Sequence, residues 1–376
     1  MLFRAMLIIG AMLLVAYANG ANDNFKGVAT LFGSGVADYR NALGWATLAT
    51  LAGSVAAMFV ATRLIFVFQG QGLVPDELIH SPDFLASAVL GAALTVVAAT
   101  RIGMPISTTH SLTGALLGSA VAAVGFHMNV GTLAQSFFLP LLISPLIALA
   151  ATFLLYPLLR AALRSAGVDG QTCVCIGSEA ITATVTPEGC ALSNTANPLR
   201  VIVDQEACCV QRLTGSMLGI NVQKFIDYGH YFSAGAVSFA RGLNDTPKIV
   251  ALGIAAGALG LEWSIGLVAI VIAVGGLLHA RRVAETVSRR ITAMEPDQGF
   301  LANVVTSFLV IFASKWGMPV STTHVSCGSL FGIGAANGHA QWGVIRNILL
   351  AWVLTLPFAG ISAGLVYLLL ARQAAL

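Results

Sequence analysis

Charged residues are scarce in this sequence. Asp, Glu, Lys and Arg make up 9% of the 376 residues and hydrophobic residues make up 57%, whereas an ordinary soluble domain has about 25% charged residues. So few charges cannot cover a water-exposed surface, which excludes an ordinary soluble protein. Apolar stretches of the roughly 20 residues that span a bilayer occur throughout, from residues 2–19 to residues 345–371. The sequence therefore predicts a multi-pass integral membrane protein surrounded by membrane lipid.

A large excess of either charge is also absent. The net charge is +3 and the basic residues are scattered, so we expect neither nucleic-acid binding nor a polybasic membrane anchor. The first apolar stretch includes Arg4 but lacks an obvious small-residue cleavage site. We therefore expect a retained helix and not a cleaved signal peptide.

Several motifs that carry chemistry in other proteins are missing. Five of the six cysteines lie between residues 173 and 209 and the sixth is Cys327, an arrangement that argues against a closed disulfide framework. The Cys-x-x-Cys spacing of zinc sites does not occur, so we expect no metal site and no cofactor. His-Glu-x-x-His does not occur, and the Gly-x-Ser-x-Gly match at 360–364 lies inside an apolar segment and not at a strand-to-helix turn, so we expect no enzyme and no catalytic residues.

What the sequence does contain is two matching sets of five apolar segments. The first set covers residues 2–35, 42–68, 84–101, 104–126 and 132–163, and the second covers residues 225–258, 263–280, 300–314, 318–336 and 345–371. The polar residues 164–224 separate them and include short β-like runs such as 199–203. The sequence predicts a first membrane repeat over 1–163, a polar cysteine-bearing insert over 164–224, and a second membrane repeat over 225–376.

Two motifs recur in the same order in both sets, which indicates internal duplication. GANDNFKGVA at 20–29 matches GLNDTPKIVA at 242–251, so that Asn244 follows Asn22 by 222 residues. RIGMPISTTHSLTGALLG at 101–118 matches KWGMPVSTTHVSCGSLFG at 315–332, at a spacing of 214 residues. The two spacings are nearly equal, as expected if the halves arose from one ancestral unit.

The distribution of positive charge favours opposite orientations for the two halves. Residues 69–83 contain no Lys or Arg, whereas the matching loop at 281–298 contains four Arg, and positive residues accumulate in cytoplasmic loops. Five crossings per half would produce this inversion. We expect an all-α membrane protein of two inverted repeats in the plasma (inner) membrane, with the insert in the cytoplasm and both termini external.

Charged residues inside apolar segments include Asp23, Lys26, Asp245 and Lys248. Each costs about 2.5–3.5 kcal/mol to insert, so each is a candidate functional residue. The simpler alternative is that each Asp neutralises the Lys three residues later. Nearby Gly and Pro residues predict broken or re-entrant helices whose free backbone groups line a cavity, and together with the duplication they favour a binding site.

The Pro-x-Ser-Thr-Thr-His motif predicts helices that begin near residues 105 and 319. A helix start buried in the membrane directs its unpaired amides at whatever lies ahead of it, and an oxyanion is the natural occupant. His110 and His324 could donate to the anion or carry a coupled proton, as could the Asp residues. The candidate donors are the hydroxyls of Ser107, Thr108, Thr109, Ser321, Thr322 and Thr323.

Together these motifs closely resemble the inorganic phosphate transporter (PiT) family, whose duplicated pattern is Gly-Ala-Asn-Asp-x-x-Asn with Pro-x-Ser-Thr-Thr-His. The resemblance implies an inverted-repeat carrier that works by alternating access, with phosphate bound between the motifs and sodium or protons moving with it. The matched positions are Asn22, Asp23, Ser107, Thr108, Thr109 and His110 in the first half, and Asn244, Asp245, Ser321, Thr322, Thr323 and His324 in the second.

The sequence departs from the family where Lys26 and Lys248 replace the usual Asn. We hypothesise that these ammonium groups take the place of sodium or contact the anion, which favours proton coupling. Phosphate can donate a proton to Asp23 or Asp245 and sulfate cannot, so we expect phosphate, with a sulfate permease of the same family as the alternative. The duplicated broken helices favour a carrier over an oxyanion channel. A homodimer is compatible with the sequence, which does not determine the oligomeric state.

Overall fold

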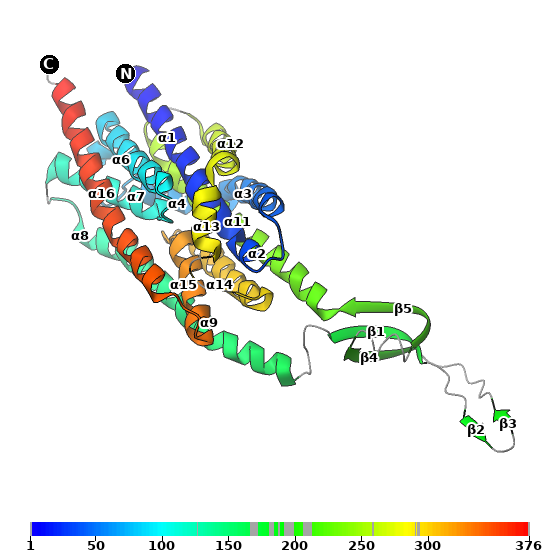
Figure 1. Ribbon diagram of the computed structural model, residues 1–376. Coiled ribbons are helices and arrows are strands. Elements are labelled where there is room, and N and C mark those ends of the chain that lie inside the picture. Colours follow the sequence, from blue (N-terminus) through cyan, green and yellow to red (C-terminus); the bar gives the residue numbers. More distant parts are fainter. Residues whose placement is uncertain are drawn as a thin grey trace. The chain divides into compact units, whose positions relative to one another are not determined.

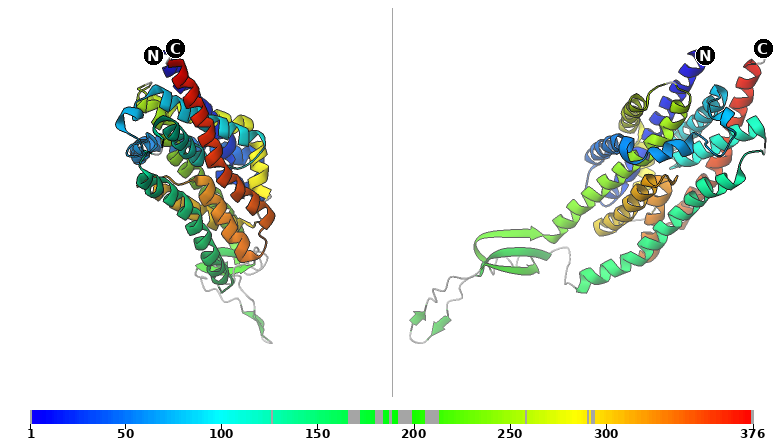
Figure 2. Two further views of the ribbon diagram at one scale, coloured as in Figure 1. Left: turned by 90° about the vertical axis from the view of Figure 1, so that its left-hand side faces the viewer. Right: turned by 180° about the vertical axis from the view of Figure 1, so that it is seen from behind.

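The computed structural model describes residues 2–125, 127–165, 172–179, 184–186, 189–191, 199–205, 213–257, 259–289, 291 and 294–374. The chain forms two compact units. Unit 1 consists of Met1–Tyr156 together with His230–Leu376, and unit 2 consists of Pro157–Gly229. Both matched halves of the sequence therefore contribute to one compact body, and the two chain ends lie at the same end of it (Figure 1, Figure 2).

The secondary-structure elements described in unit 1 are all helices, as the sequence predicts. The first half contains α1 (Leu2–Asp23), the 3₁₀ helix η1 (Asn24–Val28), α2 (Ala29–Gly33), α3 (Tyr39–Val60), α4 (Thr62–Phe68), α5 (Asp76–Ile79), α6 (Pro82–Arg101), α7 (Thr108–Val124), α8 (Val130–Thr132), the π-helical turn η2 (Leu133–Phe138) and α9 (Leu139–Ser165). The second half contains α11 (Val222–Ala255), α12 (Leu261–His279), α13 (Arg281–Arg289), α14 (Pro296–Lys315), α15 (Thr322–Asn337) and α16 (Trp342–Ala374).

Seven helical stretches in the described part are long and apolar enough to cross a membrane. They are Phe3–Gly33, Tyr39–Val60, Pro82–Arg101, Val130–Ser165, Leu261–His279, Pro296–Lys315 and Trp342–Gln373. The remaining three of the ten expected segments contain α7, α11 and α15, which carry the repeated motifs. α7 and α15 have 17 and 16 residues, which is short for a span of roughly 20. The chain is thus a multi-pass membrane protein, and five crossings per half remain a prediction.

Helices of one half pack against helices of the other in a reciprocal pattern. Gly20 in α1 touches the backbone of α12, and the matching Gly242 in α11 touches the backbone of α3. Gly114 in α7 touches α16, and the matching Gly328 in α15 touches α9. At all four positions an added Cβ would collide with a carbonyl oxygen, so glycine permits the close crossing. These oxygens belong to Ile272, Thr50, Leu356 and Pro145 respectively.

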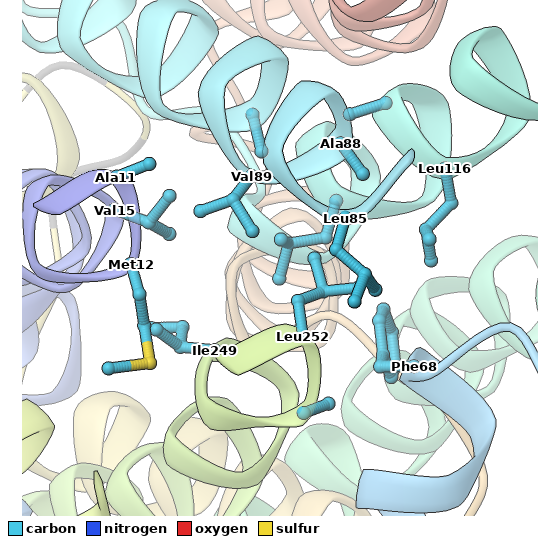
Figure 3. Packing of buried hydrophobic residues seen from close by; sticks show 14 of the residues in the cluster. Ala11, Met12, Val15, Phe68, Leu85, Ala88, Val89, Leu116, Ile249 and Leu252 are labelled. Carbon is cyan, nitrogen blue, oxygen red and sulfur yellow. The ribbon is translucent and has the colours of Figure 1, made fainter. Parts of the chain in front are cut away.

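The largest apolar core lies where α1, α6 and α11 meet, with α4 and α7 beside them (Figure 3). Val15 of α1 faces Val89 of α6, whereas Met12 of α1 points toward Ile249 of α11 (Figure 3). Leu252 of α11 belongs to the same core. Ile249 lies within the second copy of the Asn-Asp-x-x-Lys motif, at 242–251, and Leu252 directly follows it, so this core holds that motif in a defined place between α1 and α6.

The two charged motifs differ in backbone conformation, which corrects one prediction. In the first half the α-helix ends at Asp23 and a 3₁₀ turn follows over Asn24–Val28, so this helix is interrupted as expected. In the second half α11 continues through Pro247 without a break, so the broken helix predicted there is wrong. Proline removes only one backbone hydrogen bond of the helix. Residues Asn244–Lys248 are buried by neighbouring helices, and this packing stabilises α11 on both sides of Pro247.

Two further boundaries differ from the predictions. α7 begins at Thr108 and α15 at Thr322, three residues later than expected. Ser107 and Ser321 are the N-caps, so the prolines two residues before them lie outside the helices. The expected loop at 281–298 contains the short helix α13, in which Val283 and Val287 are buried. Apolar residues four apart share one helix face, and packing of that face orders the segment.

Unit 2 contains β-strands, so the all-α prediction does not extend to it. β1 (Thr172–Glu179) lies between β4 (Leu199–Gln205) and β5 (Leu213–Asn221) and is antiparallel to both, with Val174 opposite Val203 and Ile220. β2 (Thr184–Thr186) and β3 (Gly189–Ala191) form a separate antiparallel pair. The β-like run expected at 199–203 falls within β4. The side chains of the insert cysteines lie outside the described residues.

Candidate functional site

The starts of α7 and α15 lie against each other inside unit 1. Thr109, in the first turn of α7, donates to the carbonyl of Val320 at 3.3 Å, and Thr323, in the first turn of α15, donates to the carbonyl of Ile106 at 3.1 Å. Each helix start therefore contacts the extended residues that lead into the other. The side chains of Ser107 and Ser321 accept the backbone N–H three residues on, at 3.1 and 3.2 Å, which caps both helices.

Lys26 joins these two helix starts from the first half. Its Nζ donates to the Asn22 amide oxygen at 2.8 Å, to the Ile106 carbonyl at 2.7 Å and to the Thr323 hydroxyl at 2.9 Å, and it forms an ion pair with Asp23. Four oxygens thus surround one ammonium group. The ion pair expected as the simpler alternative is present, but the same Lys also reaches α15 in the other half.

Lys248 makes the matching contacts from the second half. Its Nζ donates to the Thr109 hydroxyl at 2.8 Å and to the Val320 carbonyl at 2.7 Å, and lies 3.7 Å from Asp245 Oδ1. Val320 corresponds to Ile106, and Thr109 corresponds to Thr323, by the 214-residue spacing of the motif. The two lysines therefore exchange partners between the halves.

Asn22 and Asn244 connect the charged motifs to the ends of α6 and α14. Asn22 donates to the Thr100 hydroxyl and to the Met104 carbonyl, both at 3.0 Å. Asn244 accepts from the Ser314 hydroxyl at 3.0 Å and donates to the Val320 carbonyl at 3.1 Å. Both Asn side chains are thus fully engaged in positioning backbone around the helix starts.

The two carboxylates are brought together by Asn19, which the sequence analysis did not select. Asn19 Nδ2 lies 2.9 Å from Asp23 Oδ2, 3.1 Å from Asp245 Oδ2 and 3.0 Å from the Thr108 hydroxyl. Thr108 itself donates to Asp23 at 2.8 Å. Thr322, the counterpart of Thr108, is buried at the first position of α15. All twelve predicted substrate-binding side chains are buried in unit 1.

The predicted histidines meet each other at one wall of an apolar cavity. The rings of His110 and His324 have centroids 4.1 Å apart, and His324 stacks on Trp352 at 3.6 Å. Among the described residues His324 Nε2 has no hydrogen-bond partner. The cavity has a volume of about 830 Å³ and is lined mainly by Leu, Phe and Trp side chains of α9, α15 and α16. The histidines thus contact an apolar space as well as the capped helix starts.

Arg241 is the most important residue that the sequence analysis missed. Its guanidinium donates to Asn19 at 2.7 Å, to Asn24 at 3.0 Å and to Thr50 at 3.2 Å, and its Nε lies 3.8 Å from Asp245 Oδ2. The side chain is 1% exposed. The insertion cost that singled out the Asp and Lys residues applies equally to an Arg within residues 225–258, so this signal was available.

Comparison with known proteins agrees with the motif analysis. The phosphate transporter family matches residues 19–363. A Pyrococcus abyssi protein named "Putative phosphate permease PYRAB14010" is 28% identical over 97% of this chain and 96% of its own length. "Inorganic phosphate transporter 2-1, chloroplastic" from Arabidopsis thaliana is 26% identical over 94% of this chain and 70% of its own length.

A solved structure has the same fold. That structure, "The sodium-dependent phosphate transporter", superimposes with a TM-score of 0.76 at 21% identity and covers 98% of this chain and 99% of its own. The family match confirms the resemblance inferred from the motifs and confirms that the protein is a transporter and not an enzyme. With the match extending over both halves, from residue 19 to residue 363, the chain belongs to the phosphate transporter family.

Proposed function

We propose that this protein is a secondary active transporter that imports inorganic phosphate across the plasma (inner) membrane by alternating access. The observation that carries the proposal is the reciprocal contact of Lys26 and Lys248 with the starts of α7 and α15. Helix starts present unpaired amides and a positive dipole end. Two such starts with two ammonium groups between them form a place that favours an oxyanion.

The substrate-binding residues in this proposal are the twelve selected from the motifs. Their hydroxyl and amide groups supply donors, and the carboxylates of Asp23 and Asp245 supply acceptors for the protonated oxygens of phosphate. Sulfate has no proton to donate and is repelled by an ionised carboxylate. A sulfate permease is the second candidate, because Lys26 is paired with Asp23 and reduces that repulsion.

The exchange of helix partners supports two inverted repeats, one in residues 1–163 and one in residues 225–376. The crossing of α1 with α12 has a counterpart in α11 with α3. The contacts of Lys26 with Ile106 and Thr323 have counterparts in those of Lys248 with Val320 and Thr109. A site built from matching elements of two inverted repeats can open to either side by equivalent movements. In this arrangement both termini are external and the insert at 164–224 is cytoplasmic.

The lysines further lead us to propose that phosphate uptake does not require sodium and is coupled to protons. Lys26 Nζ is surrounded by four oxygens, which is more than its three N–H groups can bond at once. Oxygen shells of this kind are typical of hard cations, so the ammonium group occupies a position suited to a metal cation. Sodium coupling remains the alternative, in view of the name of the solved relative.

Uptake of labelled phosphate into proteoliposomes tests these proposals. We expect saturable uptake that arsenate inhibits and sulfate does not, and that is equal in sodium and choline buffers at the same pH gradient. Inhibition by sulfate alone would favour the sulfate permease, and a strict sodium requirement would contradict the role given to the lysines. Asp23→Asn should abolish uptake, while the matched change Asp76→Asn, at an exposed position in α5, should not.

A further inference from the structure

The buried charges of the site are distributed unequally between the two halves. Asp23 and Lys26 in the first half correspond to Asp245 and Lys248 in the second. Arg241, however, corresponds to the neutral Asn19, 222 residues earlier. The two side chains contact each other at 2.7 Å, so one position of the repeat holds a cation in one half and its hydrogen-bond acceptor in the other.

This difference leaves the site with one positive charge in excess. Lys26, Lys248 and Arg241 are three cations, and Asp23 and Asp245 are the two carboxylates that contact them among the described residues. The other titratable side chains that border the cluster are His110 from α7 and His324 and Cys327 from α15, all counted as neutral. Three positive and two negative groups give a formal charge of +1.

The excess charge lies on the side of Lys248 and Arg241. Asp23 pairs with Lys26, whereas Asp245 is shared between Lys248, at 3.7 Å, and Arg241, at 3.8 Å. The hydrogen bonds of the guanidinium go to the neutral oxygens of Asn19, Asn24 and Thr50. Its Nε has no hydrogen-bond partner among the described residues. A guanidinium does not lose its proton in proteins, so this charge cannot be removed by deprotonation.

We propose that the charge of Arg241 makes the anion-loaded carrier reorient between the two sides of the membrane faster than the empty carrier. An uncompensated buried charge is costly in a low-dielectric interior, and a bound anion compensates it. The loaded carrier therefore reorients readily, while the empty carrier is held back. Exchange of internal for external phosphate needs only the loaded carrier, so exchange should outpace net transport. This inference rests on the proposed alternating-access function.

The wild-type protein provides the first test. Proteoliposomes loaded with labelled phosphate are diluted into buffer with or without unlabelled phosphate, at one pH on both sides. We expect efflux into phosphate to exceed efflux into phosphate-free buffer by at least about tenfold, which corresponds to a barrier difference of about 1.4 kcal/mol. Equal rates would overturn the inference but leave the transport function intact. Absence of both fluxes would overturn the proposed function itself.

Substitutions at Arg241 provide the second test. Arg241→Gln removes the excess charge and should bring the ratio of exchange to net efflux close to one, mainly by releasing the empty carrier and so speeding net efflux. Arg241→Lys keeps the charge and should keep the ratio, although it loses the forked hydrogen bonds. Arg346→Gln, at an exposed position of α16, is the matched control and should not change the ratio. A ratio unaltered by Arg241→Gln would contradict the proposal. If that variant does not fold, the wild-type ratio and Arg241→Lys still decide.

Discussion

Lys26 in η1 donates a hydrogen bond of 2.9 Å to the hydroxyl of Thr323 in α15, 297 residues further along the chain. The equivalent bond, of 2.8 Å, joins Lys248 in α11 to Thr109 in α7. Each half of the protein thus supplies an ammonium group to the helix start of the other half. This exchange means that neither half contains a complete site, and it sets the expectations for substitutions that follow.

Replacing both lysines with the residue usual in the family should change the cation requirement. In Lys26→Asn with Lys248→Asn, the oxygens around each ammonium lose their internal cation, so we expect uptake to fall strongly in choline buffer and to recover in sodium buffer. Lys315→Asn, at the exposed end of α14, is the control. The measurement is phosphate uptake against sodium concentration, and equal loss in both buffers would argue against a shared cation position.

Removing the cap of either buried helix should weaken both stability and binding. Ser107→Ala leaves the His110 amide without its acceptor, and loss of an N-cap costs about 0.5–2 kcal/mol. Ser321→Ala should behave alike, since its bond to His324 is equivalent. Thermal unfolding in detergent with and without phosphate measures the effect. Ser81 caps α6 through a longer bond of 3.5 Å, so Ser81→Ala is the control. A larger loss of stability in Ser81→Ala than in Ser107→Ala would contradict this prediction.

Substituting the glycines at helix crossings should prevent assembly of unit 1. In Gly20→Ala or Gly242→Ala the new Cβ meets a backbone carbonyl, so α1 must move from α12, or α11 from α3. We expect loss of folded protein in size-exclusion chromatography. Gly10→Ala in the same helix α1 meets no atom within 4 Å and should stabilise the protein by about 0.5–1 kcal/mol, because Ala favours helix. Equal behaviour of Gly10 and Gly20 variants would refute the crossing argument.

The histidine pair should affect proton coupling more than phosphate binding. His110→Asn and His324→Asn remove the ring pair but leave the lysine contacts in place. We expect uptake driven by a pH gradient to fall by about tenfold or more if these imidazoles carry the coupled proton, while phosphate exchange at equal pH continues. His127→Asn, at an exposed position, is the control. If exchange and gradient-driven uptake fall together, the histidines serve structure or binding.

The sequence by itself was sufficient for the membrane class, the duplication and the residues of the two motifs. These depend on local properties. Few charges and long apolar stretches predict a membrane protein, and two motifs repeated at a nearly constant spacing indicate duplication. The β-run at 199–203 and the serine-capped motif helices were likewise predictable, because strand propensity and capping act over a few residues.

The tertiary structure alone decided how the motifs meet. Sequence rules break a helix at Pro247, yet burial on all sides holds α11 continuous there. Nothing local indicates that Lys26 contacts Thr323 and not Thr109, or that Asn19 joins the two carboxylates. These relationships depend on packing between helices hundreds of residues apart, where close glycine crossings fix the distance and the cost of burying charge forces each polar group to find a partner.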